Sequence, residues 1–134
     1  MLATGGTVVR HRNKHGHVKS FDFSLLPVAE PMQRSLAAVF AARCARRWTV
    51  HKTAGQAFDH VMRFAQFLAA LEHPPGDFDE LTVAMVKRWR RSRSGRPGGY
   101  QDLVWIGSLL RDDERLAAGW PWHRDLAPVR HLRF

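Results

Sequence analysis

The sequence has little cysteine and no long apolar run. Its single cysteine, Cys44, cannot form an internal disulfide and falls among the apolar residues of an expected helix, so we expect a small core residue rather than a reactive thiol. No uncharged apolar stretch approaches the roughly 18 to 20 residues that a membrane span needs. The first residues lack the charged and apolar regions of a signal peptide. We therefore expect a cytoplasmic protein that does not bind a membrane.

The usual signatures of catalysis and of metal binding are also missing. His11, His15 and His17 lie close together, but their spacing matches no usual zinc pattern and no cysteine accompanies them. Ser108 and Cys44 stand outside any local nucleophile motif, and no glycine-rich loop ends in the Gly-Lys-Ser/Thr that binds nucleotide phosphates. We expect no catalytic residue, no metal and no cofactor.

Acidic residues are scarce, and they are unevenly distributed. The 134 residues include 21 lysines and arginines against 12 aspartates and glutamates, which gives a formal net charge of +9. Such an excess favours polyanionic partners. No acid lies between Glu30 and Asp59 or between Glu80 and Asp102, so we expect a phosphate-contacting surface rather than a mixed, solubilising one. The cations of the two gaps are Arg34, Arg43, Arg46, Arg47 and Lys52, and then Lys87, Arg88, Arg90, Arg91, Arg93 and Arg96.

The first 30 residues show no helical period. Residues 7–11 and 17–23 are candidate strands, and Asn13-Lys-His-Gly16 between them is typical of a turn. A β-hairpin is one reading of this segment, although two strands alone are marginally stable in water.

Two amphipathic helices are predicted next. Pro31 suits a helix start, and one apolar face follows it, formed by Met32, Leu36, Val39, Phe40 and Cys44. Thr53 is the expected cap of the second helix, whose apolar stripe consists of Phe58, Val61, Phe64, Ala65, Phe67, Leu68 and Leu71. Its polar side is expected to carry Gln56, Asp59, His60, Arg63 and Gln66.

Two further helices complete the pattern. Thr82 caps a third helix with Met85, Val86 and Trp89 facing inward, and that helix gives way to a flexible basic loop over residues 91–99. Tyr100 opens a fourth helix with Leu103, Ile106 and Leu110 on its apolar side, extended by Leu116 and stopped at Gly119.

These elements predict an all-α fold, a compact bundle of four to five helices, with a short N-terminal β-hairpin as a possible addition. We divide the chain into an N-terminal extension at residues 1–30, a helical DNA-binding domain at residues 31–121 and a C-terminal tail at residues 122–134.

The order of features resembles one known family. An arginine-rich first helix and Arg47-Trp48 precede Phe64-Ala-Gln-Phe-Leu68, Asp79-Glu-Leu-Thr82, a helix with Trp89, a basic loop and Leu116-Ala-Ala-Gly-Trp-Pro121. Over roughly residues 21–121 this resembles the N-terminal core-binding (SAM-like) domain of tyrosine recombinases, the phage-integrase family. The shared features are a diffuse helix pattern without a catalytic signature.

The resemblance implies a helical bundle that forms half of a clamp around duplex DNA, with its second and fourth helices near the major groove. Carried over by position, it implies DNA contacts from Lys52, Thr53, Gln56, His60 and Arg63, and from Arg93, Arg96, Tyr100, Gln101 and Trp105. The segregated charge adds Arg46, Arg47, Lys87, Arg90 and Arg91 to this candidate DNA-binding set.

The sequence departs from that family in its catalytic residues. Family members cut DNA with a separate domain that supplies Arg, Lys, a His-x-x-Arg element and a tyrosine nucleophile. Here the only tyrosine, Tyr100, lies inside the binding module, and His131-Leu-Arg133 has the wrong spacing. We therefore expect a protein that contacts duplex DNA, with a recombinase or another copy of itself as a further possible partner, and that does not cleave DNA.

Two alternatives stay open. A helical protein-interaction module could dock on an acidic partner or on a full-length recombinase. A helix-turn-helix regulator would need a short turn between two steeply crossed helices, and the expected length of the loop over residues 91–99 argues against it.

Overall fold

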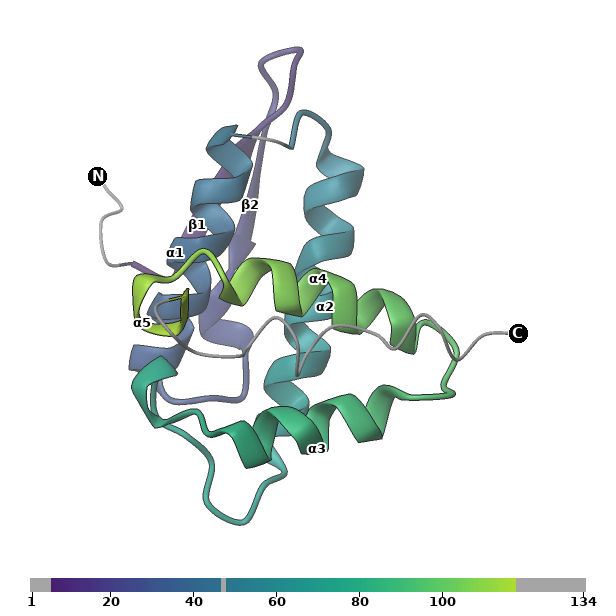
Figure 1. The fold of residues 1–134 in the computed structure, drawn as a ribbon. Helices are drawn as coiled ribbons and strands as arrows, with labels where there is room; N and C mark the ends of the chain where they lie inside the picture. The colour runs from purple at the N-terminus through teal and green to yellow at the C-terminus, as the bar shows by residue number, and fades with distance from the viewer. Residues whose placement is uncertain (1–5, 47, 118–134) are drawn as a thin grey trace. The chain divides into compact units, whose positions relative to one another are not determined.

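The computed structural model describes residues 6–46 and 48–117, and most of these residues are helical (Figure 1). The described chain contains five α-helices, preceded by a two-stranded antiparallel hairpin. The mostly helical fold class and the N-terminal hairpin are therefore confirmed. The chain divides into two compact units, and the division falls between Glu80 and Leu81. The predicted tail at residues 122–134 lies outside the described residues.

The hairpin of the first unit turns one cross-strand pair of apolar side chains into the core. Strands β1 (Val8–Arg12) and β2 (Val18–Asp22) pair with Val9 opposite Phe21, and both of these side chains are buried. The turn closes because the Asn13 side chain accepts two backbone N–H groups, 2.9 Å each, and because Gly16 adopts a φ of 84°.

An aromatic cluster joins the hairpin to the helices of its own unit. Helix α1 (Glu30–Arg46) packs on β1 and on the 3₁₀ helix η1 (Phe23–Leu25). The rings of Phe21 and Phe23 meet Phe40 of α1 at centroid distances of 5.3 and 5.0 Å, in edge-to-face geometry. This packing explains how a hairpin of two short strands is stabilised.

Helix α2 (His51–Ala69) buries most of the predicted apolar stripe and leaves Phe58 and Phe67 half-buried, but two expectations about it are wrong. The helix begins two residues before Thr53, after Val50, so Thr53 is an interior residue and not the cap. His60 is buried, with 8% of its surface exposed, because it follows Ala57 by three residues and precedes Phe64 by four, within the buried stripe. The unit closes with the 3₁₀ helix η2 (Phe78–Glu80).

In the second unit, helix α3 (Val83–Arg93) starts at the predicted cap, where the Thr82 hydroxyl accepts the Met85 N–H at 3.2 Å. Helices α3 and α4 (Gly99–Leu110) run side by side in opposite directions (Figure 1). Their connection is the five-residue stretch 94–98, because the residues expected to open a long loop, Arg91 to Arg93, are still helical.

Helix α4 ends earlier than expected. It stops at Leu110, and Leu116 lies buried in a separate short helix, α5 (Glu114–Ala117). The break occurs at Asp113, whose carboxylate accepts the Arg115 backbone N–H at 2.9 Å and pairs with its guanidinium. The predicted stop at Gly119 lies outside the described residues.

Candidate nucleic-acid interface

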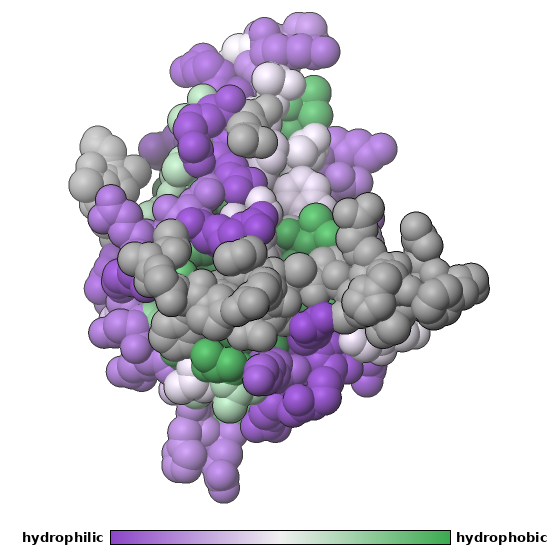
Figure 2. All heavy atoms as spheres, in the orientation of Figure 1, coloured by the Kyte–Doolittle hydropathy of each residue, from purple (hydrophilic) through white to green (hydrophobic). Residues whose placement is uncertain are grey.

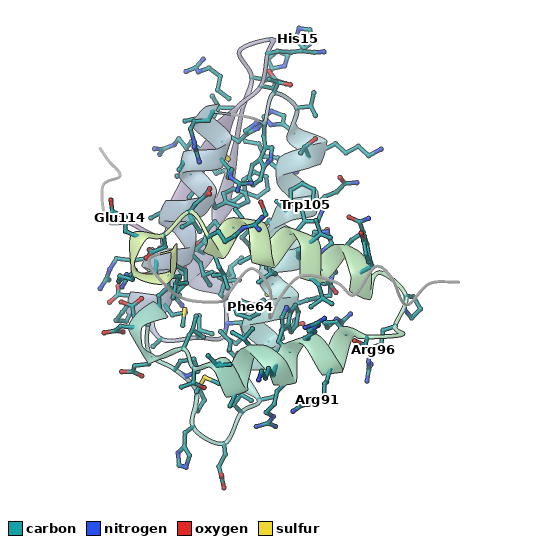
Figure 3. All side chains as sticks on the ribbon, viewed as in Figure 1. His15, Phe64, Arg91, Arg96, Trp105 and Glu114 are labelled. Atoms are coloured by element: carbon teal, nitrogen blue, oxygen red, sulfur yellow. The ribbon has the colours of Figure 1, made fainter. Side chains whose placement is uncertain are left out.

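The exposed side of α3 is cationic from Lys87 onward. Lys87, Arg88 and Arg91 are all exposed, and Arg91 follows Lys87 by four residues and Arg88 by three, so the three side chains share one side of the helix. No acidic residue occurs in α3 or in the connection that follows it, where Arg96 is also exposed. Figure 3 shows Arg91 and Arg96 extending away from the α3–α4 pair. We call these four residues the α3 surface.

Like charges at this spacing repel one another, each pair by a few tenths of a kcal/mol in an isolated helix. The helix dipole offsets part of that repulsion, because Arg90, Arg91 and Arg93 occupy the last turn of α3, where the carbonyl groups favour cations. An anionic ligand would remove the remaining repulsion. The arrangement therefore suits a polyanion that neutralises several charges at once.

Arg93 occupies a different environment from the other candidates. Its Nη2 lies 2.8 Å from the Oδ2 of Asp102 on α4, whose side chain is fully buried, and 19% of the Arg93 side chain is exposed. The guanidinium also lies 5.6 Å from the centre of the Trp89 ring. Arg93 thus links the end of α3 to the first turn of α4.

The α3–α4 connection is a tight turn. The N–H of Ser94 donates to Arg90 O, that of Arg96 to Arg93 O and that of Gly99 to Arg96 O, at distances of 2.9 to 3.2 Å. A Cβ atom on Gly99 would lie 1.8 Å from Arg93 O, so only glycine permits this approach. The expectation of a loop over residues 91–99 is therefore wrong, because α3 continues to Arg93 and these bonds close the connection within residues 94–98.

The short connection also changes the comparison with a helix-turn-helix regulator. The length of the connection no longer argues against a helix-turn-helix regulator. The arrangement of the helices does, because α3 and α4 lie antiparallel and side by side (Figure 1) instead of crossing steeply.

The candidates on α4 lie in its first two turns. Tyr100 and Gln101 are exposed, and 49% of the Tyr100 surface is accessible. Trp105 is half-buried and extends from α4 on the side away from α3 (Figure 3). Tyr100 also lies one helical turn before the exposed Val104, which gives this helix a small apolar patch.

The candidates of the first unit divide into exposed and buried groups. Lys52 and Gln56 are exposed on α2, and Arg46 is exposed at the end of α1. Thr53 is half-buried, whereas His60 is buried and its Nδ1 lies 3.0 Å from Nη2 of the half-buried Arg63. Arg47 lies outside the described residues. The first unit therefore offers fewer outward contacts from α2 than the resemblance implies.

Comparison with models of known protein families, with curated proteins and with solved structures found no match for this chain. The resemblance to the core-binding domain of tyrosine recombinases therefore stays a prediction.

Cys44 lies half-buried in α1, and burial raises the pKa of its thiol to about 12. The thiol is thus protonated at neutral pH, which agrees with a packing role. In the described part of the chain, no three His, Cys, Asp or Glu side chains gather to hold a metal ion. No helix in the same residues has the length and apolar character to cross a membrane.

The histidines instead take part in a local hydrogen-bonded network within the first unit. His11 is fully buried, and its Nε2 lies 2.7 Å from Trp48 O, which can only accept a hydrogen bond. When His11 is neutral, its Nδ1 is then the acceptor for Nδ1–H of His51, 2.8 Å away. These bonds join β1 to the segment that leads into α2.

Two groups of cations were not among the DNA-binding residues predicted from the sequence. Arg88 belongs to the acid-free stretch and shares the exposed side of α3 with Lys87 and Arg91. The cations of the hairpin were not predicted as DNA-binding residues. The signal that could have found them is the alternation in Val8-Val-Arg-His-Arg12, which turns Val9 and His11 inward and Arg10 and Arg12 outward.

Proposed function

We propose that this protein is a duplex-DNA-binding module that contacts the phosphate backbone through the α3 surface. The observation that carries the proposal is the row of Lys87, Arg88 and Arg91, exposed on one side of a helix that contains no acid. Duplex DNA presents a dense, regular line of negative charge, and phosphate contacts provide most of the affinity of such proteins. Arginine side chains are suited to phosphate because the planar guanidinium forms paired hydrogen bonds.

The resemblance to core-binding domains gives the proposal its biological setting. If it holds, the module contacts DNA during site-specific recombination or DNA integration, in the cytoplasm, and without cleaving the strand itself. Tyr100 and Gln101 would then add modest sequence preference from the first turn of α4, where both are exposed.

The test is a titration of a fluorescent duplex at several salt concentrations, measured by anisotropy. We expect binding at low salt whose affinity falls steeply as salt rises. Replacing Lys87, Arg88 and Arg91 by glutamine should reduce the slope of log affinity against log salt by about 2 to 3. Absence of duplex binding by the parent protein at low salt would overturn the proposal.

A charge-matched control separates the α3 surface from net charge. Glutamine at Arg34, Arg111 and Arg115 removes the same charge from positions outside that surface, each of them exposed or half-buried. This control should bind almost as the parent does. Equal weakening by both variants would mean that net charge, and not the α3 surface, determines binding.

The absence of cleavage is tested separately. A single-turnover reaction with a suicide duplex, from which a cleaved end is lost, would trap a covalent adduct if Tyr100 acted as a nucleophile. We expect no adduct.

A protein-interaction role is the second candidate, favoured by the exposed apolar pair Tyr100 and Val104 on α4. It makes the opposite prediction for the α3 surface. Reversing the charges of Lys87, Arg88 and Arg91 would then leave nucleic-acid binding unchanged while disrupting a protein complex.

A further inference from the structure

The hairpin end of the first unit gathers cations that come from three separate parts of the chain. Figure 1 shows the hairpin tip, the last turn of α1 and the first turn of α2 at the same end of this unit. Contacts fix that arrangement: Lys14 N donates to Thr49 O at 2.9 Å, and His11 binds both Trp48 O and His51. We call this region the hairpin surface; its exposed cations are Arg10, Arg12, Lys14, Lys19, Arg46 and Lys52.

The acids of the first unit lie away from this surface. Asp22 pairs with Val8 at the far end of the hairpin, and Glu30 lies in the first turn of α1, at its opposite end. The first acid of α2 is Asp59, about 12 Å along the helix axis from His51. The first unit is therefore electrically polarised, with its positive end at the hairpin. Figure 2 shows mostly hydrophilic side chains there.

The hairpin is held in place instead of hanging free. Its turn is closed by the Asn13 side chain and by the bond from Arg12 Nη1 to Gly16 O at 3.2 Å, and its base is anchored by Phe21. The residues directly opposite Arg10 and Arg12 on β2 are Ser20 and Val18, so neither arginine has an acid as its cross-strand partner, and Asp22 lies one pair further along, opposite Val8. Binding to a polyanion would thus order few additional groups, which lowers its entropic cost.

From this arrangement we infer that the hairpin surface is a second contact site for the phosphate backbone of duplex DNA, separate from the α3 surface. The inference rests on the proposed function, because it assigns the same class of ligand. It adds a strand element to a module whose predicted contacts are all helical or in loops. The contacts are charge-based and independent of base sequence.

The test uses the full chain with Arg10, Lys14 and Lys52 replaced by glutamine. These three side chains are exposed, and no contact in the described structure depends on them. We expect the slope of log affinity against log salt to fall by about 2 to 3, to a similar extent for unrelated duplex sequences. The variant with glutamine at Arg34, Arg111 and Arg115 has the same net charge and should bind almost as the parent does.

The outcomes separate the two proposals. Normal binding by the hairpin variant, together with weakened binding by the α3 variant, would overturn the hairpin surface and leave the proposed function standing. A parent protein that binds no duplex would overturn both. Circular dichroism checks that each variant is folded. The single substitution Arg10→Gln, on the outward face of β1, should alone reduce the slope by about one; an unchanged slope counts against the inference.

Discussion

The side chain of Arg93 shows that a cation in a basic stretch can form an internal ion pair. Its guanidinium pairs with the buried Asp102 at 2.8 Å and lies over Trp89. Breaking a buried ion pair by removing one partner leaves the other charge uncompensated, which commonly costs about 3 to 5 kcal/mol. Sequence position alone cannot separate such a residue from Arg91, which is exposed two residues earlier.

We therefore expect Asp102→Asn to lower the free energy of unfolding by about 3 kcal/mol, measured by urea denaturation. Asparagine preserves the shape of the side chain, so the change isolates the charge. Glu72→Gln is the control, because that carboxylate is 90% exposed, and it should change stability by less than about 0.5 kcal/mol. Equal stability of the two variants would show that the pair is incidental and that Arg93 is available to a ligand.

The His11–His51 pair predicts how stability depends on pH. The pKa of His51 is lowered first by loss of hydration and then by the nearby His11, Lys19 and His17, while a backbone contact with His17 opposes the shift. Because the folded state binds the His51 proton less readily than the unfolded state, the unfolded chain takes up more protons as pH falls below about 7. The contribution of His51 to stability is thus full above the unfolded pKa of about 6.5 and declines below it.

Urea denaturation between pH 8 and pH 5 tests this expectation. The parent should lose more stability over that interval than His51→Gln does, since glutamine does not titrate. His73→Gln serves as the control because the His73 side chain is 91% exposed. If His51→Gln and the parent lose stability in parallel, the hydrogen bond between the two rings does not link folding to protonation.

At the level of elements, Gly99 determines how closely α3 and α4 approach each other. A Cβ atom at this position would collide with the backbone of Arg93, which has no side-chain freedom to move aside. We expect Gly99→Ala to lower the free energy of unfolding by about 2 kcal/mol or more. Gly55→Ala in α2 is the matched control. It meets nothing within 4 Å and should stabilise the protein by about 0.5 to 1 kcal/mol.

The elements also show which features can be predicted from the sequence. The apolar stripe of α2 and the Thr82 cap of α3 depend on neighbours within a few residues, so the local pattern predicts them. Thr53 has the side chain of a cap, but α2 starts earlier, where the segment before it is bonded to the hairpin 30 or more residues away in sequence. Distant contacts of that kind leave no local pattern.

The residues of the candidate interface also include some that local sequence predicts and others that depend on distant contacts. The cations of α3 were predictable because charge segregation within one helix is visible along the chain. Alternation along β1 indicates that Arg10 and Arg12 face outward, but the surface they form with Lys14 depends on strand pairing and on the bond from the turn to Thr49. Burial of His60, by contrast, follows from its spacing to Ala57 and Phe64 along α2, a local pattern that outweighs its polar residue type.

For the molecule as a whole, the central question is whether the two cationic surfaces act on one duplex at the same time. They belong to different compact units and share no side chain, so the two charge-removing variants should not perturb each other directly. If both surfaces contact the same duplex, the first contact raises the effective concentration of the second. The losses in binding free energy from the two variants should then add when all six substitutions are combined.

Anisotropy titration of the parent, the two triple variants and the combined variant measures this additivity. We expect the change in salt slope to reach about 4 to 6 in the combined variant, the sum of the two separate changes. A combined variant no weaker than the worse of the two triple variants would mean that the other surface contributes nothing to binding. If the surfaces instead bound DNA as alternatives, each triple variant would bind nearly as the parent does and only the combined variant would lose binding.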